Sequence, residues 1–292
     1  MSASGYCNVH DFNTVYNTSD PAEFECVAVS VIKDLKVCLY PTEVDRWISG
    51  EIRRIGVWEK ELNTAITSAM ARYPNATLLD AGANLGMHSL VVAKSGRKVV
   101  AVEPKLSTVM RLHKSVNINQ LKSRITLVKN AISNERVTLN LYNDQSNQGR
   151  SSLKFLGQQA LQQDAVKTIL FDDLWEVLHQ ERELIIKIDI EASETRALLN
   201  ASKIFTSLKV HAVFMEWVHF QMTLSKASEA PSREVELIHV MVATLRRYGF
   251  QARPIDPTFR YTMSPYAALS YSDMHNWPID IVWIRPWPGV VS

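Results

Sequence analysis

Short apolar runs alternate with segments of helical periodicity between Thr77 and Tyr248. Apolar strands separated by helices are typical of a mostly parallel sheet that helices cover on both faces. The predicted strands are Leu78–Ala81, Lys98–Val102, Ile125–Val128, Leu184–Ile188 and Ala212–Met215. The predicted helices lie near Gly86–Lys94, Lys105–Asn119, Phe171–His179, Glu194–Asn200 and Arg233–Tyr248.

Two further segments have the pattern of antiparallel strands. Val137–Tyr142 alternates between apolar and polar residues, and Ile279–Ile284 is a mainly apolar run shortly before Pro286. We therefore expect an α/β fold with a mostly parallel twisted sheet, helices on both faces and a late antiparallel strand. The polar segment Asn143–Arg150 is expected to form a loop or a lid.

The first part of the chain has a different pattern. Phe24–Val31 and Lys36–Tyr40 are short alternating runs separated by turn residues, and a helical rhythm follows over Glu59–Tyr73. We expect the chain to divide into a mixed or β-rich cap at residues 1–58 and an α/β domain at residues 59–292.

Composition excludes several classes of partner. The 292 residues carry a net charge of +2, which argues against a dedicated nucleic-acid binder. No apolar run is long enough for a transmembrane helix, and Met1–Gly5 lacks the features of a signal peptide. Cys7, Cys26 and Cys38 are odd in number and lack metal-ligand spacing. We therefore expect a cytoplasmic protein in a reducing compartment, with neither a nucleic acid nor a membrane as its partner.

The segment Leu78–Leu90 has the pattern of a ligand-binding strand, turn and helix. Asp80 ends the strand, and Gly82 and Gly86 allow the backbone to approach a neighbour closely before the helix begins. Glu103 follows about twenty residues after the turn begins, where a carboxylate can accept hydrogen bonds from a ribose diol. The pattern therefore predicts a ligand that contains a nucleoside.

The same turn discriminates between two such ligands. A dinucleotide-binding turn reads G-x-G-x-x-G, whereas this chain has Asn84 at the place of the second glycine, where a side chain crowds a pyrophosphate. Asp80 is a poor neighbour for a phosphate and a good one for an ammonium group. S-adenosylmethionine has a ribose diol and an amino-acid end but no phosphate, so it fits this turn better than NAD.

A second group of polar residues follows the predicted strand Leu184–Ile188. Lys187 and Asp189 lie on one face of this strand, and Asp189 is at its carboxyl end, where ligands bind in open α/β sheets. An acid that ends so apolar a strand is costly unless it is used or paired. Glu191 and Glu194 fall at the entrance of the next helix, where Glu194 could equally serve as a cap.

Together these motifs resemble the FkbM family of class I S-adenosylmethionine-dependent methyltransferases. The resemblance covers about residues 56–218 and rests on Asp80-x-Gly82-Ala83-Asn84-x-Gly86, Glu103-Pro104, Asp172-Asp173-Leu174 and Lys187-x-Asp189-x-Glu191-x-x-Glu194. The stretch Gly56–Glu59 also resembles a glycine–aromatic–Glu segment of this family. The family usually has Glu-Gly where this chain has Glu191 and Ala192, and the turn is expected to survive unless that position needs a positive φ.

The resemblance implies a Rossmann-like class I methyltransferase domain at residues 59–292 with S-adenosyl-L-methionine as its cofactor. It implies that Glu103 holds the ribose hydroxyls and that Asn130 and Ala131 border the adenine. The residues expected around the methionine end of the cofactor are Asp80, Gly82, Ala83, Asn84 and Gly86.

Methyl transfer to a hydroxyl needs a base, because an alcohol must lose its proton as it attacks. The available groups are Asp189, Glu191, Glu216 and His219, and the predicted catalytic residues are Asp189 first, then Glu191 and His219. His88 could also act as a base, but a role in packing its helix against the sheet is favoured. No motif fixes a metal ion, so none is expected.

The resemblance implies an acceptor of small size, since the family typically methylates hydroxyl groups of sugars, polyketides and related molecules. The main prediction is therefore O-methylation of a sugar, glycan or small metabolite. Four aromatic residues could form a stacking surface for a sugar, although a place in the core explains them as well: Trp217, Tyr261, Tyr266 and Trp277. Three alternatives stay open: N-methylation, a nicotinamide-dependent oxidoreductase, and a binding protein that retains the fold without turnover. The acceptor and the oligomeric state are not predicted.

Overall fold

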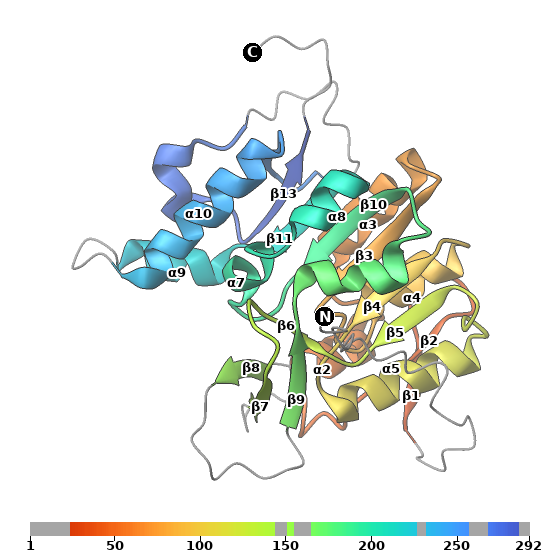
Figure 1. Ribbon diagram of the computed structural model, residues 1–292. Coiled ribbons are helices and arrows are strands. Elements are labelled where there is room, and N and C mark those ends of the chain that lie inside the picture. The colour runs from red at the N-terminus through yellow and green to blue at the C-terminus, as the bar shows by residue number, and fades with distance from the viewer. Residues whose placement is uncertain (1–23, 144–150, 155–164, 227–231, 257–267, 286–292) are drawn as a thin grey trace, which may run out of the picture.

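The main sheet of the protein has seven strands in the order β12-β13-β11-β10-β3-β4-β5 (Figure 1). The computed structural model describes residues 24–143, 151–154, 165–226, 232–256 and 268–285. In chain order the seven strands are β3 (Ala76–Ala81), β4 (Val99–Val102), β5 (Ile125–Val128), β10 (Glu183–Ile188), β11 (Lys209–Glu216), β12 (Gln251–Pro254) and β13 (Asp280–Ile284). β13 runs antiparallel to both of its neighbours, and the other pairings are parallel. This confirms the mostly parallel sheet with a late antiparallel strand.

Helices cover both faces of the sheet because successive strand residues point to opposite sides. In β3, Leu78 belongs to one hydrophobic core and its neighbour Leu79 to the other, and both side chains are fully buried. The first core contains α3 (Lys60–Arg72), α4 (Met87–Lys94) and α5 (Leu106–Ile118). The second contains α6 (Trp175–Leu178), α7 (Glu194–Leu198), α8 (Ser202–Ser207) and α10 (Arg233–Arg247). Burial on both faces explains why the strands appear as apolar runs.

Several elements differ from the sequence-based expectation. The helix expected near Phe171–His179 is a 3₁₀ turn, η2 (Phe171–Leu174), followed by the short α6. Elements that the pattern did not predict include α2 (Ile48–Ile55), α8, α9 (Val218–Ser225), β12 and the 3₁₀ helix η3 (Tyr271–Asn276). In the described residues, no helix combines the length and apolar character needed to cross a membrane.

A smaller sheet with the order β6-β9-β7-β8 follows β5 and extends beyond the main sheet (Figure 1). Its strands are β6 (Ala131–Ile132), β7 (Thr138–Asn143), β8 (Ser151–Lys154) and β9 (Ala165–Ile169). β7 is antiparallel to both β8 and β9, as the alternation over Val137–Tyr142 indicated. The loop or lid expected at Asn143–Arg150 lies, beyond Asn143, outside the described residues.

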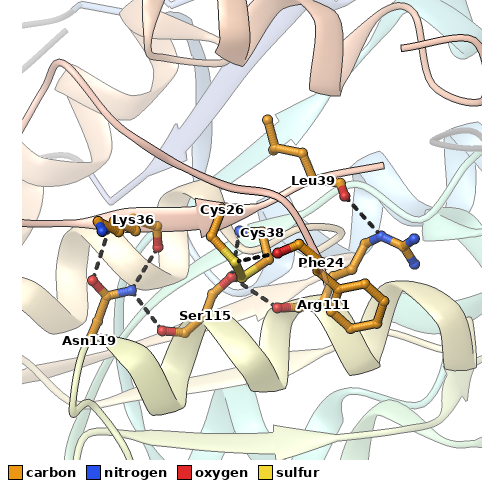
Figure 2. The surroundings of a disulfide bond; sticks show 8 residues. All are labelled: Phe24, Cys26, Lys36, Cys38, Leu39, Arg111, Ser115 and Asn119. Atoms are coloured by element: carbon orange, nitrogen blue, oxygen red, sulfur yellow. Dashed lines mark hydrogen bonds between the residues drawn. A yellow bond between two sulfur atoms is a disulfide. The ribbon is translucent and has the colours of Figure 1, made fainter. Parts of the chain in front are cut away.

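The N-terminal segment packs directly on the α/β domain. β1 (Cys26–Ala28) and β2 (Lys36–Cys38) form an antiparallel pair that lies along α5 (Figure 2). The backbone N–H of Cys38 donates to Ser115 Oγ at 2.9 Å, and that of Lys36 donates to Asn119 Oδ1 at 2.9 Å. Val37 of β2 belongs to the same hydrophobic core as α4 and α5. The boundary at residue 58 stays a prediction.

Cys26 and Cys38 form a disulfide bond, which the sequence analysis did not anticipate (Figure 2). The two residues face each other in the register of β1 and β2, so their side chains lie on the same side of the strand pair. Disulfides form and persist in oxidising compartments and are rare in the cytosol. The bond therefore argues against the reducing, cytoplasmic compartment expected from the cysteine pattern.

Candidate functional site

The turn between β3 and α4 is held close to two neighbouring elements, which explains its glycines. Gly82 and Gly86 both have a φ of +83°, a conformation that favours glycine. A Cβ on Gly82 would lie 1.7 Å from the carbonyl oxygen of Asp189, and one on Gly86 would lie 2.2 Å from Leu112 Cδ1. The glycines thus bring the turn against the end of β10 and against α5.

Asn84 occupies the centre of this turn with a φ of 51°. Asn tolerates the left-handed region better than most residues, because its short side chain bonds the local backbone. Its Oδ1 accepts a hydrogen bond from the Leu85 N–H at 2.8 Å. A side chain therefore stands where a dinucleotide-binding turn would have its second glycine.

Glu103, at the end of β4, is tied to the same turn. Its Oε2 accepts a hydrogen bond from the Asn84 N–H at 3.1 Å, and its Oε1 accepts one from the Lys105 N–H at 2.9 Å. Burial raises the pKa of Glu103 to about 7, although both of these hydrogen bonds favour the charged form. The carboxyl group is held in one orientation at the wall of a narrow cleft.

This cleft gathers predicted cofactor residues from separate parts of the chain. Gly82 and Asn84 come from the turn, Glu103 from the end of β4, and Asn130 and Ala131 from the segment after β5. Its lining also includes residues that the sequence analysis did not single out, among them Lys105, Thr108, Ile132 and Leu141.

Beneath the turn lie three charged residues, of which Asp80 and Lys187 are buried and Asp189 is half-buried. Lys187 Nζ donates to the Gly82 carbonyl and to Asp189 Oδ2, both at 3.1 Å, and lies 4.0 Å from Asp80 Oδ1. Desolvation lowers the pKa of Lys187, but the charges of Asp189 and Asp80 outweigh it and raise the pKa overall. Asp80 is fully buried, accepts a hydrogen bond from Ser89 Oγ at 2.6 Å, and is not among the lining residues of the cleft.

A larger cavity of about 540 Å³ opens next to the cleft. Four residues line both spaces: Gly82, Asn84, Asp189 and Glu191. Ala83 lines the larger cavity, whereas Gly86 lines neither space. The larger cavity is also lined by residues of α2, the segment before α3, the start of α4 and α9. Among its lining residues are Trp47, Trp58, Glu59, His88, Glu216 and Met222. The two spaces therefore meet at the end of β10.

Glu191 and Glu216 of the cavity lining lie beside His219, which itself lines neither space. His219 Nε2 lies 3.4 Å from Glu191 Oε2 and 3.5 Å from Glu216 Oε2. Burial, reinforced by the charge of Asp189, raises the pKa of Glu216 to about 8, and burial also raises the pKa of Asp189. Glu216 can therefore hold and release a proton near neutral pH. Within the described ranges, no three His, Cys, Asp or Glu side chains converge in a way that could hold a metal ion.

The turn after β10 contains the departure from the family pattern. Glu191 and Ala192 have φ values of 54° and 67°, and the Ser193 N–H donates to the Ile190 carbonyl at 3.3 Å. The position where the family has glycine therefore does need a positive φ, which costs alanine roughly 1 kcal/mol. Glu194 Oε1 accepts a hydrogen bond from the Ile190 N–H at 2.7 Å, which supports the capping interpretation of Glu194.

Glu59 is a cavity residue that the sequence analysis did not select. It precedes α3, and its Oε2 lies 3.0 Å from His88 Nε2. His88 is also bonded to Asn63 of α3, through Nδ1 at 3.3 Å, so it both packs α4 against α3 and lines the cavity. The resemblance of Gly56–Glu59 to a family segment was the signal that could have identified Glu59.

The aromatic residues considered as a stacking surface are not among the described lining residues of the cavity. Trp217 and Trp277 are buried in the core with ring centroids 4.7 Å apart, so the expectation is wrong for these two. Tyr261 and Tyr266 lie outside the described residues. The aromatic wall of the cavity instead comes from Trp47, which is 61% exposed, and Trp58.

Comparisons with known proteins bear on this arrangement. The sequence model of the family described as Methyltransferase FkbM domain matches residues 80–252. An O-methyltransferase from Bacillus cereus in complex with SAH has 11% identity and a TM-score of 0.43, with 78% of this chain and 82% of that chain covered. The O-methyltransferase TomG from Streptomyces achromogenes, in complex with SAM, has 9% identity and a TM-score of 0.44, with 86% and 92% covered. No curated protein sequence matches the chain.

Proposed function

The chain belongs to the Methyltransferase FkbM domain family, and on this premise we propose that it transfers the methyl group of S-adenosylmethionine to a hydroxyl of a small acceptor. A sugar, a glycan or a small metabolite is the acceptor class proposed. The observation that supports this most is the meeting of a narrow cleft and a larger cavity at Asp189 and Glu191. Such a junction suits the transfer of a group between two ligands held side by side.

The charge of the cleft supports S-adenosylmethionine rather than a dinucleotide. Three carboxyl residues line it, Glu103, Asp189 and Glu191, against the single basic residue Lys105 among the described lining residues. A pyrophosphate would meet repulsion there, in addition to the side chain of Asn84. A nicotinamide-dependent oxidoreductase is therefore not proposed.

The residues predicted to bind the cofactor each have a role in this proposal. Glu103 accepts hydrogen bonds from the ribose hydroxyls, and Asn130 and Ala131 border the adenine. Gly82, Ala83 and Asn84 line the methionine end, while Asp80 supports the turn from below through Ser89 and Lys187. When bound, S-adenosylmethionine supplies a methyl group already activated by its sulfonium.

We assign the removal of the acceptor proton to Asp189, which lines both spaces. Its raised pKa, caused by burial, makes it a better base than an exposed carboxylate, and Lys187 holds it at 3.1 Å. Glu191 is the second candidate base. His219, between Glu191 and Glu216, is placed to pass the proton on toward solvent.

N-methylation of an amine is the second candidate, because one observation favours it. Glu59 and Glu191 give the larger cavity an acidic lining, which suits an acceptor that carries a positive charge. The same donor site would serve both reactions.

The test is transfer of labelled methyl groups to matched panels of hydroxyl and amine acceptors. The proposal predicts labelled hydroxyl acceptors and, in Asp189→Asn, a loss of turnover of about 100-fold or more. S-adenosylhomocysteine should bind this variant nearly as well as the wild type. Label on amines alone would favour the second candidate, and binding of the cofactor without transfer to any acceptor would favour a binding protein.

A further inference from the structure

We infer that Glu59 binds the α-ammonium group at the amino-acid end of the methyl donor. His88 and Asn63 hold the side-chain carboxylate of Glu59 in position. This inference rests on the proposed function. The sequence pattern suggested Asp80 as the neighbour of the ammonium group, and the inference gives this role to Glu59.

The path of the donor brings its amino-acid end toward Glu59. A nucleoside in the cleft contacts Gly82 and Asn84, and the same two residues line the larger cavity. The amino-acid end must therefore continue past the turn into that cavity. Glu59 lines this space together with Ala83 and Leu85 of the turn.

The backbone of Glu59 is held in an unusual conformation. Its φ and ψ are 47° and 57°, in the left-handed region that non-glycine residues seldom adopt. Strained residues of this kind concentrate at ligand-binding sites. Here the conformation directs the residue just before α3 toward the cavity wall.

Two hydrogen bonds in series, through His88 and Asn63, fix the carboxylate of Glu59. When the Asn63 amide donates to His88 Nδ1, the proton of the imidazole is on Nε2, which donates to Glu59 Oε2 at 3.0 Å. Asn63 and His88 are both buried, so this arrangement has little freedom. A carboxylate can accept several hydrogen bonds, so the bond from His88 leaves capacity for an ammonium donor.

Glu59 is better suited to pair with a cation than Asp80, Asp189 or Glu216. Burial raises the pKa of Glu59, but the hydrogen bond from His88 and the charge of Lys187 act against this, and the pKa is lowered overall. Asp80 is buried beneath the turn, and Asp189 is paired with Lys187 at 3.1 Å. Burial instead raises the pKa of Glu216 to about 8, which leaves its carboxyl mostly neutral at pH 7.

Two ligands separate the amino-acid end from the nucleoside. S-adenosylhomocysteine contains both parts, whereas 5′-methylthioadenosine contains the nucleoside and the sulfur but no amino acid. Calorimetry with each ligand is carried out on the wild type, on Glu59→Gln and on Glu61→Gln. Glu61 is an exposed carboxylate in the first turn of α3, two residues after Glu59, so its variant is the matched control.

We expect Glu59→Gln to weaken S-adenosylhomocysteine binding by about 10- to 100-fold, the range for a lost charged hydrogen bond. Binding of 5′-methylthioadenosine should stay within about twofold of the wild type, as should both ligands in Glu61→Gln. Glu59→Asp, which keeps the charge and tolerates a positive φ better, should lose less affinity for S-adenosylhomocysteine than Glu59→Gln.

Unchanged S-adenosylhomocysteine binding in Glu59→Gln would overturn the inference. It would also be overturned if each of the variants Glu59→Gln and Glu59→Asp lost as much affinity for 5′-methylthioadenosine as for S-adenosylhomocysteine. Normal binding of 5′-methylthioadenosine shows that a variant has folded its cleft. A wild type that binds neither ligand would instead contradict the proposed function itself.

Discussion

Of the six described non-glycine residues with a positive φ, four lie at or next to the two ligand spaces, and Asp34 and Gln120 lie elsewhere. Glu59, Asn84, Glu191 and Ala192 all have positive φ values, between 47° and 67°. Each costs roughly 1 kcal/mol for a residue other than glycine, somewhat less for Asn. Three of the four line the larger cavity, so the strain accompanies side chains directed at the site.

Ala192 provides a test of this strain. In Ala192→Gly the left-handed conformation no longer meets a Cβ penalty, and the gain exceeds the extra chain entropy of glycine. We expect the free energy of unfolding to rise by about 0.5 kcal/mol, measured by urea denaturation. The control Ala197→Gly, in the buried interior of α7, should lower it by about 1 kcal/mol or more. A destabilised Ala192→Gly would show that the turn is not strained.

The raised pKa of Glu216, about 8 through burial, predicts how stability changes with pH. Between the ordinary pKa of a glutamate and about 8, the folded protein keeps a proton that the unfolded chain has released. The free energy of unfolding should therefore fall as pH rises through this range and level off above it. Burial raises the pKa of Glu103 and Glu194 to about 7, which adds to the fall with the same sign.

Urea midpoints measured from about pH 5 to about pH 9 check this linkage. Glu216→Gln removes one of the titrating groups, so its decline should be shallower than that of the wild type. Parallel curves for the two proteins would mean that the pKa of Glu216 is the same in the folded and unfolded states.

At the scale of elements, patterns predicted the buried strands well and the short or atypical elements poorly. β3, β4, β5 and β10 are apolar because both faces are covered, and their runs were visible in the sequence. β12 has only four residues, Gln-Ala-Arg-Pro, and the proline weakens the strand pattern, so its strand state depends on pairing with β13. α9 carries apolar residues around its circumference, so it has no helical periodicity to detect.

The β1–β2 pair depends on a contact that no local pattern encodes. The disulfide between Cys26 and Cys38 closes a loop with a sequence separation of 12 residues, which stabilises a fold by about 2–3 kcal/mol in the chain-entropy description. We expect reductant to lower the melting temperature of the wild type but not that of Cys26→Ser. Thiol titration without reductant should find Cys26 and Cys38 unreactive. Equal melting with and without reductant would contradict a stabilising bond.

At the scale of the whole molecule, the carboxyl ends of β3, β4 and β10 form one edge where the cleft and the larger cavity meet. The cleft was predictable because its residues lie in motifs next to strands. The larger cavity was not, since Trp47, Glu59 and Met222 come from separate segments that only folding brings together. The burial that shifts the pKa of Glu216 is likewise a property of the folded chain.

The central claim is that the cleft beside Glu103 holds the nucleoside of S-adenosylmethionine. Calorimetry with S-adenosylhomocysteine on the wild type, Glu103→Ala and the remote control Glu183→Ala tests it most directly. The account predicts binding to the wild type and to the control, and a loss of about 10- to 100-fold in Glu103→Ala, because the ribose hydroxyls lose a charged acceptor. No binding to the wild type would contradict the methyl-donor site, and equal binding by all three proteins would contradict the role of Glu103.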